Sequence, residues 1–292
     1  MTFEKQYNSY KEQVEQAMLR ALRVPHPSPG LTEATSYSLL AAGKRARPII
    51  LLAFCDACGG YAQDALPLAA GMEMIHNYSL IHDDLPCMDN ADTRRGKPAN
   101  HKAFGDGMAL LAGDALLNLA FETMLTASDA PPDRLLRAMK VIARESGELG
   151  MIGGQALEFE SNLKEREEKL SRSISSADAG EMLAQMRIIN QLKTGALFRA
   201  AAEAGCIMAD ASPPYVTAAE QYAALLGEAF QLSDDILDIN DGEPSAARLL
   251  GADVCRARVL ALAGEAKNAL EVFEDNAGFL KDLVDFLCDR KA

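Results

Sequence analysis

The sequence has no uninterrupted apolar stretch of about 18 residues, the length that a membrane-spanning helix needs. Its N-terminus alternates charged with apolar residues, and it lacks the basic region, apolar block and small-residue cleavage site of a signal peptide. No linker, low-complexity tract or internal repeat divides the 292 residues. We therefore expect one soluble domain, residues 1–292, with no membrane span.

Positive charge is also scarce. The chain has 29 Lys and Arg residues against 42 Asp and Glu residues, which gives a net charge of −13. Such a chain repels the phosphate backbone of nucleic acid, so we expect no nucleic-acid partner. Any chemistry on phosphate groups then requires a local basic pocket or bound metal ions.

The six cysteines are scattered, with a single Cys-x-x-Cys motif at Cys55 and Cys58. A zinc site would need a second pair, and a thioredoxin-like motif would need a neighbouring βαβ pattern. Neither is visible, so we interpret the cysteines as reduced core or boundary residues. Reduced cysteines indicate a reducing compartment, most simply the cytoplasm.

Strand-like runs of alternating Val, Ile and Thr are nearly absent, whereas apolar residues recur at spacings of three and four along most of the chain. The sequence therefore predicts an all-α fold. Between residues 150 and 176 the pattern weakens, and we expect only a short charged helix there. The predicted helices are 3–22, 33–58, 62–84, 107–127, 132–149, 180–207, 215–240, 252–274 and 276–290.

A first acidic cluster, Asp83, Asp84 and Asp89, follows a largely apolar segment whose helix is predicted to end near residue 84. Carboxylates at the end of an apolar helix are costly to bury unless a cation neutralises them. A solvated helix end is the simpler alternative, because most Asp-Asp pairs occur there. The presence of a second acidic cluster favours a cation site.

The second cluster is Gln231, Asp234, Asp235 and Asp238. Positions 231, 234 and 238 lie three and four residues apart, so their side chains share one helix face. Like charges at this spacing repel unless a positive group lies among them. Mg²⁺ suits such a site, because it prefers oxygen ligands and bridges carboxylates to substrate phosphates. The twelve-residue loop of a calcium-binding EF-hand is absent.

Basic residues gather beside these clusters. Arginine offers a planar donor fork that matches phosphate, and lysine a movable point charge. Each basic segment on its own could equally be an ordinary surface patch. Thr194 adds a hydroxyl next to the last of these cations. The residues concerned are Lys44, Arg45, Arg47, Arg94, Arg95 and Lys193.

These segments, in this order, resemble the trans-prenyl diphosphate synthase family, and most closely the bacterial-type farnesyl and geranylgeranyl diphosphate synthases. The resemblance implies an isoprenoid-synthase fold, a single-domain bundle in which about ten or more helices surround a central cavity. It also implies a homodimer. It runs from about Gly43 to Asp238 and rests on GKRARP, HNYSLIHDDLPCMDNADTRRGKPANH, LLAGDALL, GMIGGQ, KTGAL and FQLSDDILD.

The resemblance also implies roles for the matching residues, in a prenyltransferase that joins isopentenyl diphosphate to an allylic diphosphate with a cluster of three Mg²⁺ ions. The implied metal ligands are Asp83, Asp84, Asp89, Asp234, Asp235 and Asp238. The implied ligands of isopentenyl diphosphate are Lys44, Arg47, His76 and Arg95. The implied allylic-substrate and catalytic residues are Arg94, Lys193, Thr194 and Gln231, together with Asp83 and Asp84.

Product length is expected to depend on Tyr78 and Ser79, which lie about one helical turn before Asp83, at ~1.5 Å per residue. In the resembling family an aromatic residue at this position limits the product, so we expect the farnesyl product from dimethylallyl or geranyl diphosphate. The alternatives are a geranylgeranyl or a geranyl diphosphate synthase. Under the other interpretation of this position, Tyr78 simply fills the core.

After Asp238 the sequence departs from the family pattern. Arg248 stands where the family usually has a first diphosphate-binding lysine, and the later Lys-x-Thr segment is missing. Glu158 and Asn190 stand where aspartate and histidine are frequent. These differences are expected to affect closure over the diphosphate, turnover and substrate choice.

Two other functions fit part of the pattern. A class I terpene cyclase also uses aspartates and Mg²⁺, but it needs no isopentenyl diphosphate site, so GKRARP and the Arg94-Arg95 pair argue against it. A non-catalytic regulatory subunit of a partner synthase would explain the shortened segment after the second cluster. Such proteins commonly lose aspartates from one cluster, and both clusters are intact here.

Overall fold

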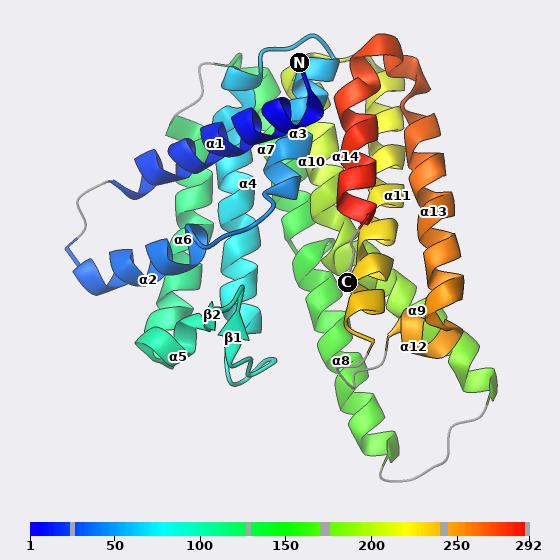
Figure 1. The fold of residues 1–292 in the computed structure, drawn as a ribbon. Coiled ribbons are helices and arrows are strands. Elements are labelled where there is room, and N and C mark those ends of the chain that lie inside the picture. The colour runs from blue at the N-terminus through cyan, green and yellow to red at the C-terminus, as the bar shows by residue number, and fades with distance from the viewer. Residues whose placement is uncertain (24–26, 127–129, 170–175, 240–244, 290–292) are drawn as a thin grey trace.

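The computed structural model describes residues 1–23, 27–126, 130–169, 176–239 and 245–289 (Figure 1). Helices make up almost all of the regular structure in these segments. The only sheet in them is a hairpin of two short antiparallel strands, β1 (Thr93–Arg94) and β2 (Lys97–Pro98). The prediction of an all-α fold is therefore confirmed.

Several helices begin where the sequence provides a start signal. Proline occupies the first turn of several helices, where its missing N–H is not needed. The helices are α1 Phe3–Leu22, α2 Pro29–Leu39, α3 Ala46–Ala57, α4 Ala62–Asp83, α5 Asn100–Phe104, α6 Asp106–Thr126, α7 Pro132–Ser146, α8 Met151–Lys169, α9 Ser176–Lys193, α10 Gly195–Met208, α11 Pro213–Leu237, α12 Ala246–Leu250, α13 Ala252–Ala269, the 3₁₀ helix η1 Glu271–Ala277 and α14 Gly278–Cys288.

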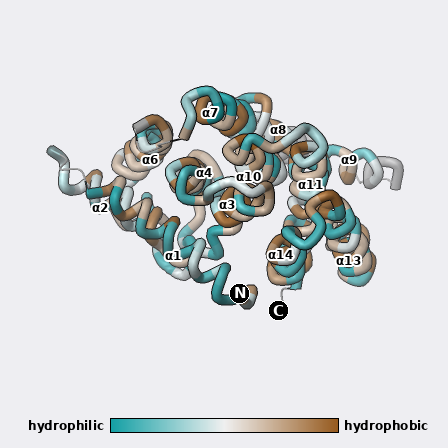
Figure 2. The backbone as a smooth tube through the Cα atoms, turned by 90° about the horizontal axis from the view of Figure 1, so that it is seen from above, coloured by the Kyte–Doolittle hydropathy of each residue, from teal (hydrophilic) through white to brown (hydrophobic). Residues whose placement is uncertain are grey.

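Helices α3, α4 and α10 form the centre of the molecule, and the remaining long helices surround them (Figure 2). Nearly every residue of α3 is buried, which explains why this helix is apolar on all sides. Its contact with α10 depends on a glycine: a Cβ on Gly205 would lie 2.3 Å from the backbone oxygen of Leu51. The two helices can therefore pack more closely than larger residues would allow.

The predicted helix 33–58 is wrong, because α2 ends at Leu39 and α3 begins only at Ala46. Arg45, in the connection, adopts the left-handed conformation with φ of 52°. Its buried guanidinium donates to the backbone oxygens of Leu39 (3.1 Å) and Ala41 (2.7 Å). These bonds satisfy carbonyls that the end of α2 leaves without helical partners, so they stabilise the break.

Two further expectations also differ from the structure. The weak pattern after residue 150 belongs to a 19-residue helix, α8, whose apolar Ile152, Leu157 and Phe159 face outward and obscure the helical period. The predicted helix 180–207 is interrupted at Thr194, between α9 and α10.

Helix α6 is long and apolar enough to cross a membrane by length and composition, although Asp114 and Glu122 interrupt its apolar run. Less than half of the apolar window is buried within the chain. Leu110, Leu111 and Leu125 are exposed on its surface.

Candidate active site

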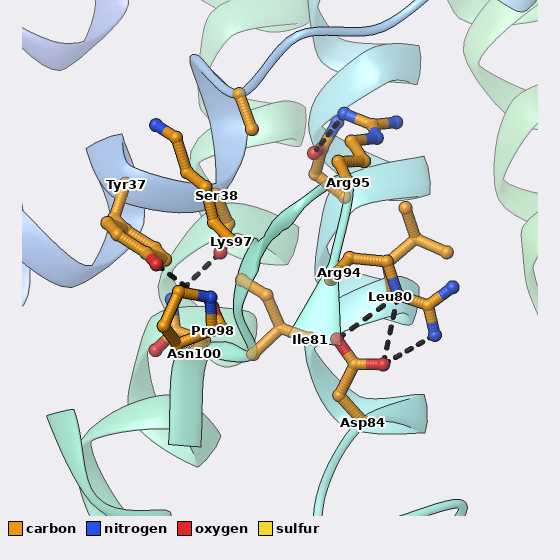
Figure 3. A pocket seen from close by; sticks show the side chains of 12 residues that line it. Tyr37, Ser38, Leu80, Ile81, Asp84, Arg94, Arg95, Lys97, Pro98 and Asn100 are labelled. Carbon is orange, nitrogen blue, oxygen red and sulfur yellow. Dashed lines mark hydrogen bonds and ion pairs between the residues drawn. The ribbon is translucent and has the colours of Figure 1, made fainter. Parts of the chain in front are cut away.

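The first acidic cluster lies at the C-terminal end of α4. Asp83 is the last residue of the helix, and the following segment folds back so that the Asp89 N–H donates to the Asp83 backbone oxygen (2.9 Å). Asp84 is only 2% exposed. The Nε of Arg94 donates to both of its carboxylate oxygens, at 3.0 and 3.2 Å (Figure 3). Arg94 therefore neutralises Asp84, while Asp83 and Asp89 stay close together.

Burial raises the pKa of Asp83 to about 6, and the negative charges of Asp89 and Glu158 add to this effect. The pKa of Asp89 is also raised, mainly by burial. Lys193, at the end of α9, opposes the rise at both aspartates. It forms an ion pair with Glu158 of α8. One ammonium group thus stabilises three carboxylates from different parts of the chain.

Glycines allow the backbone around Lys193 to pack tightly. A Cβ on Gly154 of α8 would lie 2.3 Å from the backbone nitrogen of Lys193. A Cβ on Gly227 of α11 would lie 3.2 Å from the Cα of Gly195. The interruption between α9 and α10 is therefore held between two neighbouring helices, and it places Lys193 and Thr194 at the site.

A chain of hydrogen bonds connects this interruption to the second acidic cluster. The Thr194 hydroxyl donates to Gln231 Oε1 (2.9 Å), and Gln231 Nε2 donates to Asp235 Oδ1 (3.1 Å). The backbone N–H of Ala246 donates to the other carboxylate oxygen of Asp235 (3.1 Å). We call this chain the Thr194–Gln231–Asp235–Ala246 relay. The relay connects Asp235 to Thr194, and Lys193 interacts with Asp83 and Asp89. Both acidic clusters are therefore connected to the interruption between α9 and α10.

The structure does not preassemble the predicted metal ligands. Among the described residues, no three His, Cys, Asp or Glu side chains converge closely enough to hold a metal ion. Asp84 is bonded to Arg94, and Asp235 is bonded to Gln231 and Ala246. Because like charges repel, these carboxylates are stabilised by separate protein cations and N–H groups.

The basic residues divide into two groups. Arg45 is 2% exposed and pairs with Glu73 at 2.8 Å, so it belongs to the core. Arg47 stacks over the ring of Phe198, 4.7 Å from its centroid, and its Nε is buried without a hydrogen-bond partner. Burial lowers the pKa of Arg47 to about 10, which still leaves it charged at neutral pH. A buried cation with an unused donor is suited to an anionic ligand.

His76 and Arg95 lie beside Arg47. The closest nitrogens of Arg47 and His76 are 3.4 Å apart. Burial, followed by the charges of the nearby arginines, lowers the pKa of His76 well below its ordinary value, so its ring is neutral at pH 7. Arg95 donates to Asn77 Oδ1 (3.4 Å) and lies 4.0 Å from the Glu73 carboxylate. Three of the residues predicted to bind isopentenyl diphosphate therefore come together.

The hairpin that carries Arg94 and Arg95 packs against α2. The Tyr37 hydroxyl donates to the Pro98 backbone oxygen (2.9 Å), and the Asn100 amide donates to Ser38 Oγ (2.8 Å) (Figure 3). A pocket of about 20 Å³ lies between hairpin and helix. It has room for about one water molecule, so it is not a substrate site.

The remaining predicted residues lie at the edges of this arrangement. Lys44 is exposed, and its ammonium lies 5.6 Å from the ring centroid of Phe286 in α14. Arg248 is in the short helix α12. Tyr78 is 5% exposed, and its hydroxyl has no hydrogen-bond partner. Ser79 donates to the backbone oxygen of His76 (3.0 Å).

Comparisons with known proteins agree with this geometry. A family profile described as polyprenyl synthetase matches residues 28–273. The chain belongs to the polyprenyl synthetase family. It is therefore a trans-prenyltransferase, and the predictions of family, fold class and enzyme class are confirmed.

Three matches illustrate how similar the chain is to known members of the family. Geranylgeranyl pyrophosphate synthase 11, chloroplastic, of Arabidopsis thaliana is 41% identical over 253 residues, which is 85% of this chain and 68% of the relative. Farnesyl diphosphate synthase of Geobacillus stearothermophilus is 39% identical over 255 residues, which is 87% of this chain and 81% of the relative. The apo crystal structure of an FPP/GFPP synthase from Zymomonas mobilis aligns with a TM-score of 0.87 at 35% identity and covers 98% of both chains.

Some residues of the site were not singled out from the sequence. Glu73 and Asn77 hold Arg45 and Arg95, and the sequence signal for Glu73 is a carboxylate inside the apolar run GMEMI. Glu158 stood out only as a departure from the family, whereas the structure makes it the ion-pair partner of Lys193. No pattern in the sequence indicated that Tyr37 would support the hairpin.

We predict that Asp83→Asn stabilises the metal-free protein at pH 7.5 and has little effect near pH 4. Folding raises the Asp83 pKa from 3.8 to about 6, so between these values the folded state binds more protons than the unfolded state. The free energy of unfolding therefore falls as the pH rises, by at most about 3 kcal/mol for two pKa units. Urea unfolding in EDTA measures the difference. An equal gain from the exposed Asp275→Asn control would contradict this account.

Proposed function

We propose that the chain is a short-chain prenyltransferase that condenses isopentenyl diphosphate with dimethylallyl or geranyl diphosphate to give farnesyl diphosphate. The observation that carries the proposal is the connection of two acidic helix ends through Lys193 and Thr194. Next to them lie Arg47, His76 and Arg95, which we propose to form a separate basic pocket. A two-substrate reaction of diphosphates requires these two sites. The acidic ends suit a diphosphate bound through metal ions, and the basic pocket suits one bound directly by protein cations.

The basic pocket is the proposed site of isopentenyl diphosphate. Arg47 and Arg95 would bind the diphosphate, and the neutral His76 would donate or accept a hydrogen bond beside them. Lys44, which is exposed, would complete this group. A terpene cyclase would have no use for this pocket, which favours the transferase.

The acidic clusters fit Mg²⁺. Their donors are carboxylate oxygens, which this ion prefers, and burial raises the pKa values of Asp83 and Asp89, an effect that a bound cation would offset. When bound, the ions would supply positive charge that stabilises the departing diphosphate. We propose three ions, held by Asp83, Asp84, Asp89, Asp234, Asp235 and Asp238.

The protein residues around the allylic substrate would then act in three ways. Lys193 and Arg94 would contact the allylic diphosphate and stabilise its charge as the C–O bond breaks. The oxygens of Thr194 and Gln231 would lie near the allylic cation until the double bond of isopentenyl diphosphate attacks it. The cation formed by this attack would then lose a proton to the released pyrophosphate, which leaves a double bond in the product. Arg248 in α12 would contact the diphosphate from the side of the second cluster.

Product length is the finer part of the proposal, since both farnesyl and geranylgeranyl diphosphate synthases are among the relatives. Tyr78 supports the shorter product. Its ring is buried one turn before Asp83, and burial, together with the Asp83 charge, raises its hydroxyl pKa to about 12. A bulky ring this close to the first cluster would block a longer chain.

A homodimer completes the proposal. Leu110, Leu111 and Leu125 are exposed on α6, a helix of sufficient hydropathy to span a membrane. Exposure of such an apolar face to water costs free energy. We propose that a second copy of the chain covers it.

Purified protein should convert isopentenyl diphosphate with dimethylallyl or geranyl diphosphate mainly into farnesyl diphosphate, and EDTA should abolish the reaction. Chromatographic sizing of the products after phosphatase treatment measures this. Arg47→Gln should raise the KM for isopentenyl diphosphate more than that for geranyl diphosphate. A protein with intact fold and no product from any allylic substrate would favour the non-catalytic regulatory subunit.

Tyr78→Ala should shift the products from farnesyl toward geranylgeranyl diphosphate, because removal of the ring opens space behind Asp83. The same product assay measures the ratio of chain lengths. Tyr61→Ala, at a position that is 69% exposed, is the control and should leave the ratio unchanged. An unchanged product profile in Tyr78→Ala would leave Tyr78 as a core residue only.

Sedimentation velocity should give twice the chain mass of 31.4 kDa for the wild-type protein. Leu111→Glu should shift the protein toward the monomer, because it places a charge in the proposed apolar interface. Leu260→Glu, at a 75% exposed position on α13, is the matched control. A dimer that tolerates Leu111→Glu and dissociates with the control would place the interface elsewhere.

A further inference from the structure

A cavity of about 740 Å³ lies between α9, α10, α11, α12 and α13. On α11, the cavity is lined by Ala224, Leu225, Glu228, Gln231 and Leu232. Positions three and four apart share one face of a helix, so these residues form one continuous wall. Gln231 is the one proposed catalytic residue in this lining, and the aspartates of the second acidic cluster are not part of it.

The cavity is too large to be a packing defect. Protein interiors contain few voids larger than a water molecule, whereas ligand pockets occupy roughly 300–1,000 Å³. Its walls are mostly apolar and include Leu183 and Met186 from α9, Leu225 from α11 and Val254 from α13. A hydrocarbon chain placed there would be removed from water on several sides.

The charged residues of the cavity are mainly cationic. Three arginines and one glutamate are among its lining residues. Arg187 of α9 and Arg258 of α13 each donate to Glu228 at 3.3 Å, so two guanidinium groups share this carboxylate. Arg258 also lies 3.7 Å from Glu265, outside the lining. Both arginines are partly exposed, and their planar forks retain donors for an anion.

We infer that this cavity is a binding site for a single-chain amphiphilic anion, with its hydrocarbon chain against the apolar walls and a phosphate headgroup at Arg187 and Arg258. Apolar walls and an arginine pair at one site match both halves of such a molecule. The site shares only Gln231 with the proposed catalytic residues, so binding there requires neither the proposed metal ions nor the proposed isopentenyl diphosphate site.

The cavity also borders the Thr194–Gln231–Asp235–Ala246 relay. Gln231 and Ala246 both line it, and both donate to the Asp235 carboxylate. A ligand in the cavity would therefore contact two of the groups that fix the second acidic cluster.

Isothermal titration calorimetry of the full chain with dodecyl phosphate, below its micelle concentration and in EDTA, tests the inference. EDTA removes metal-assisted binding of phosphate at the acidic clusters. We expect saturable binding of one molecule, at least about tenfold weaker binding of dodecanol, and no measurable binding of inorganic phosphate. Equal binding of dodecanol and dodecyl phosphate would overturn the role of the arginines.

Variants locate the bound molecule. Ala224→Trp and, independently, Val254→Trp should abolish binding by filling the cavity, and Arg258→Gln should weaken it about tenfold. Arg256→Gln, on the same helix with its side chain paired to Asp253, is the matched control and should bind normally. Thermal unfolding establishes that each variant is folded.

Other outcomes contradict the inference. Loss of binding in Arg47→Gln together with normal binding in Arg258→Gln would place the ligand in the proposed isopentenyl diphosphate site. No binding to the folded wild-type protein would overturn the inference outright. Either result would leave the proposed prenyl transfer standing, because the product assay measures that activity separately.

Discussion

The site depends on the neutralisation of carboxylates that the fold brings together at the ends of helices. Asp83 and Asp89 are partly buried beside Glu158, and repulsion among them is relieved by Lys193. The position of Lys193 follows from the interruption between α9 and α10, which Gly154 and neighbouring glycines accommodate. The same interruption places Thr194 at the relay, so a single backbone feature serves both acidic clusters.

The basic residues separate according to burial and partners. Arg45 is fully engaged by Glu73 and by carbonyls at the end of α2, and Arg94 is bonded to Asp84. Arg47 and Arg95 are less fully paired, and Arg47 Nε has no hydrogen-bond partner. Both lie beside His76, whose ring is neutral at pH 7. A chain with a large negative net charge thus brings Arg47, Arg95 and His76 together, while Arg45 and Arg94 are paired with particular carboxylates.

The sequence predicted most of the long helices, although not α8, and both acidic clusters, because amphipathic period and carboxylate spacing are local properties. It could not predict the break at residues 40–45, which depends on Arg45 reaching carbonyls of the preceding helix. The break at Thr194 likewise depends on glycines in α8 and α11. The partners of Asp84, Asp235 and Lys193 were also beyond the sequence, because they come from distant segments. Motifs gave the residue types of the site, and tertiary packing decided which were already paired.

The location of the metal ions tests this account most directly. Crystals grown with Mn²⁺ in place of Mg²⁺ and with pyrophosphate would reveal the ions by their anomalous scattering. The account predicts anomalous peaks between the end of α4 and the end of α11, within coordination distance of Asp83 and Asp234, on either side of the pyrophosphate. Pyrophosphate bound without ions at these aspartates, or ions held only at other carboxylates, would contradict it.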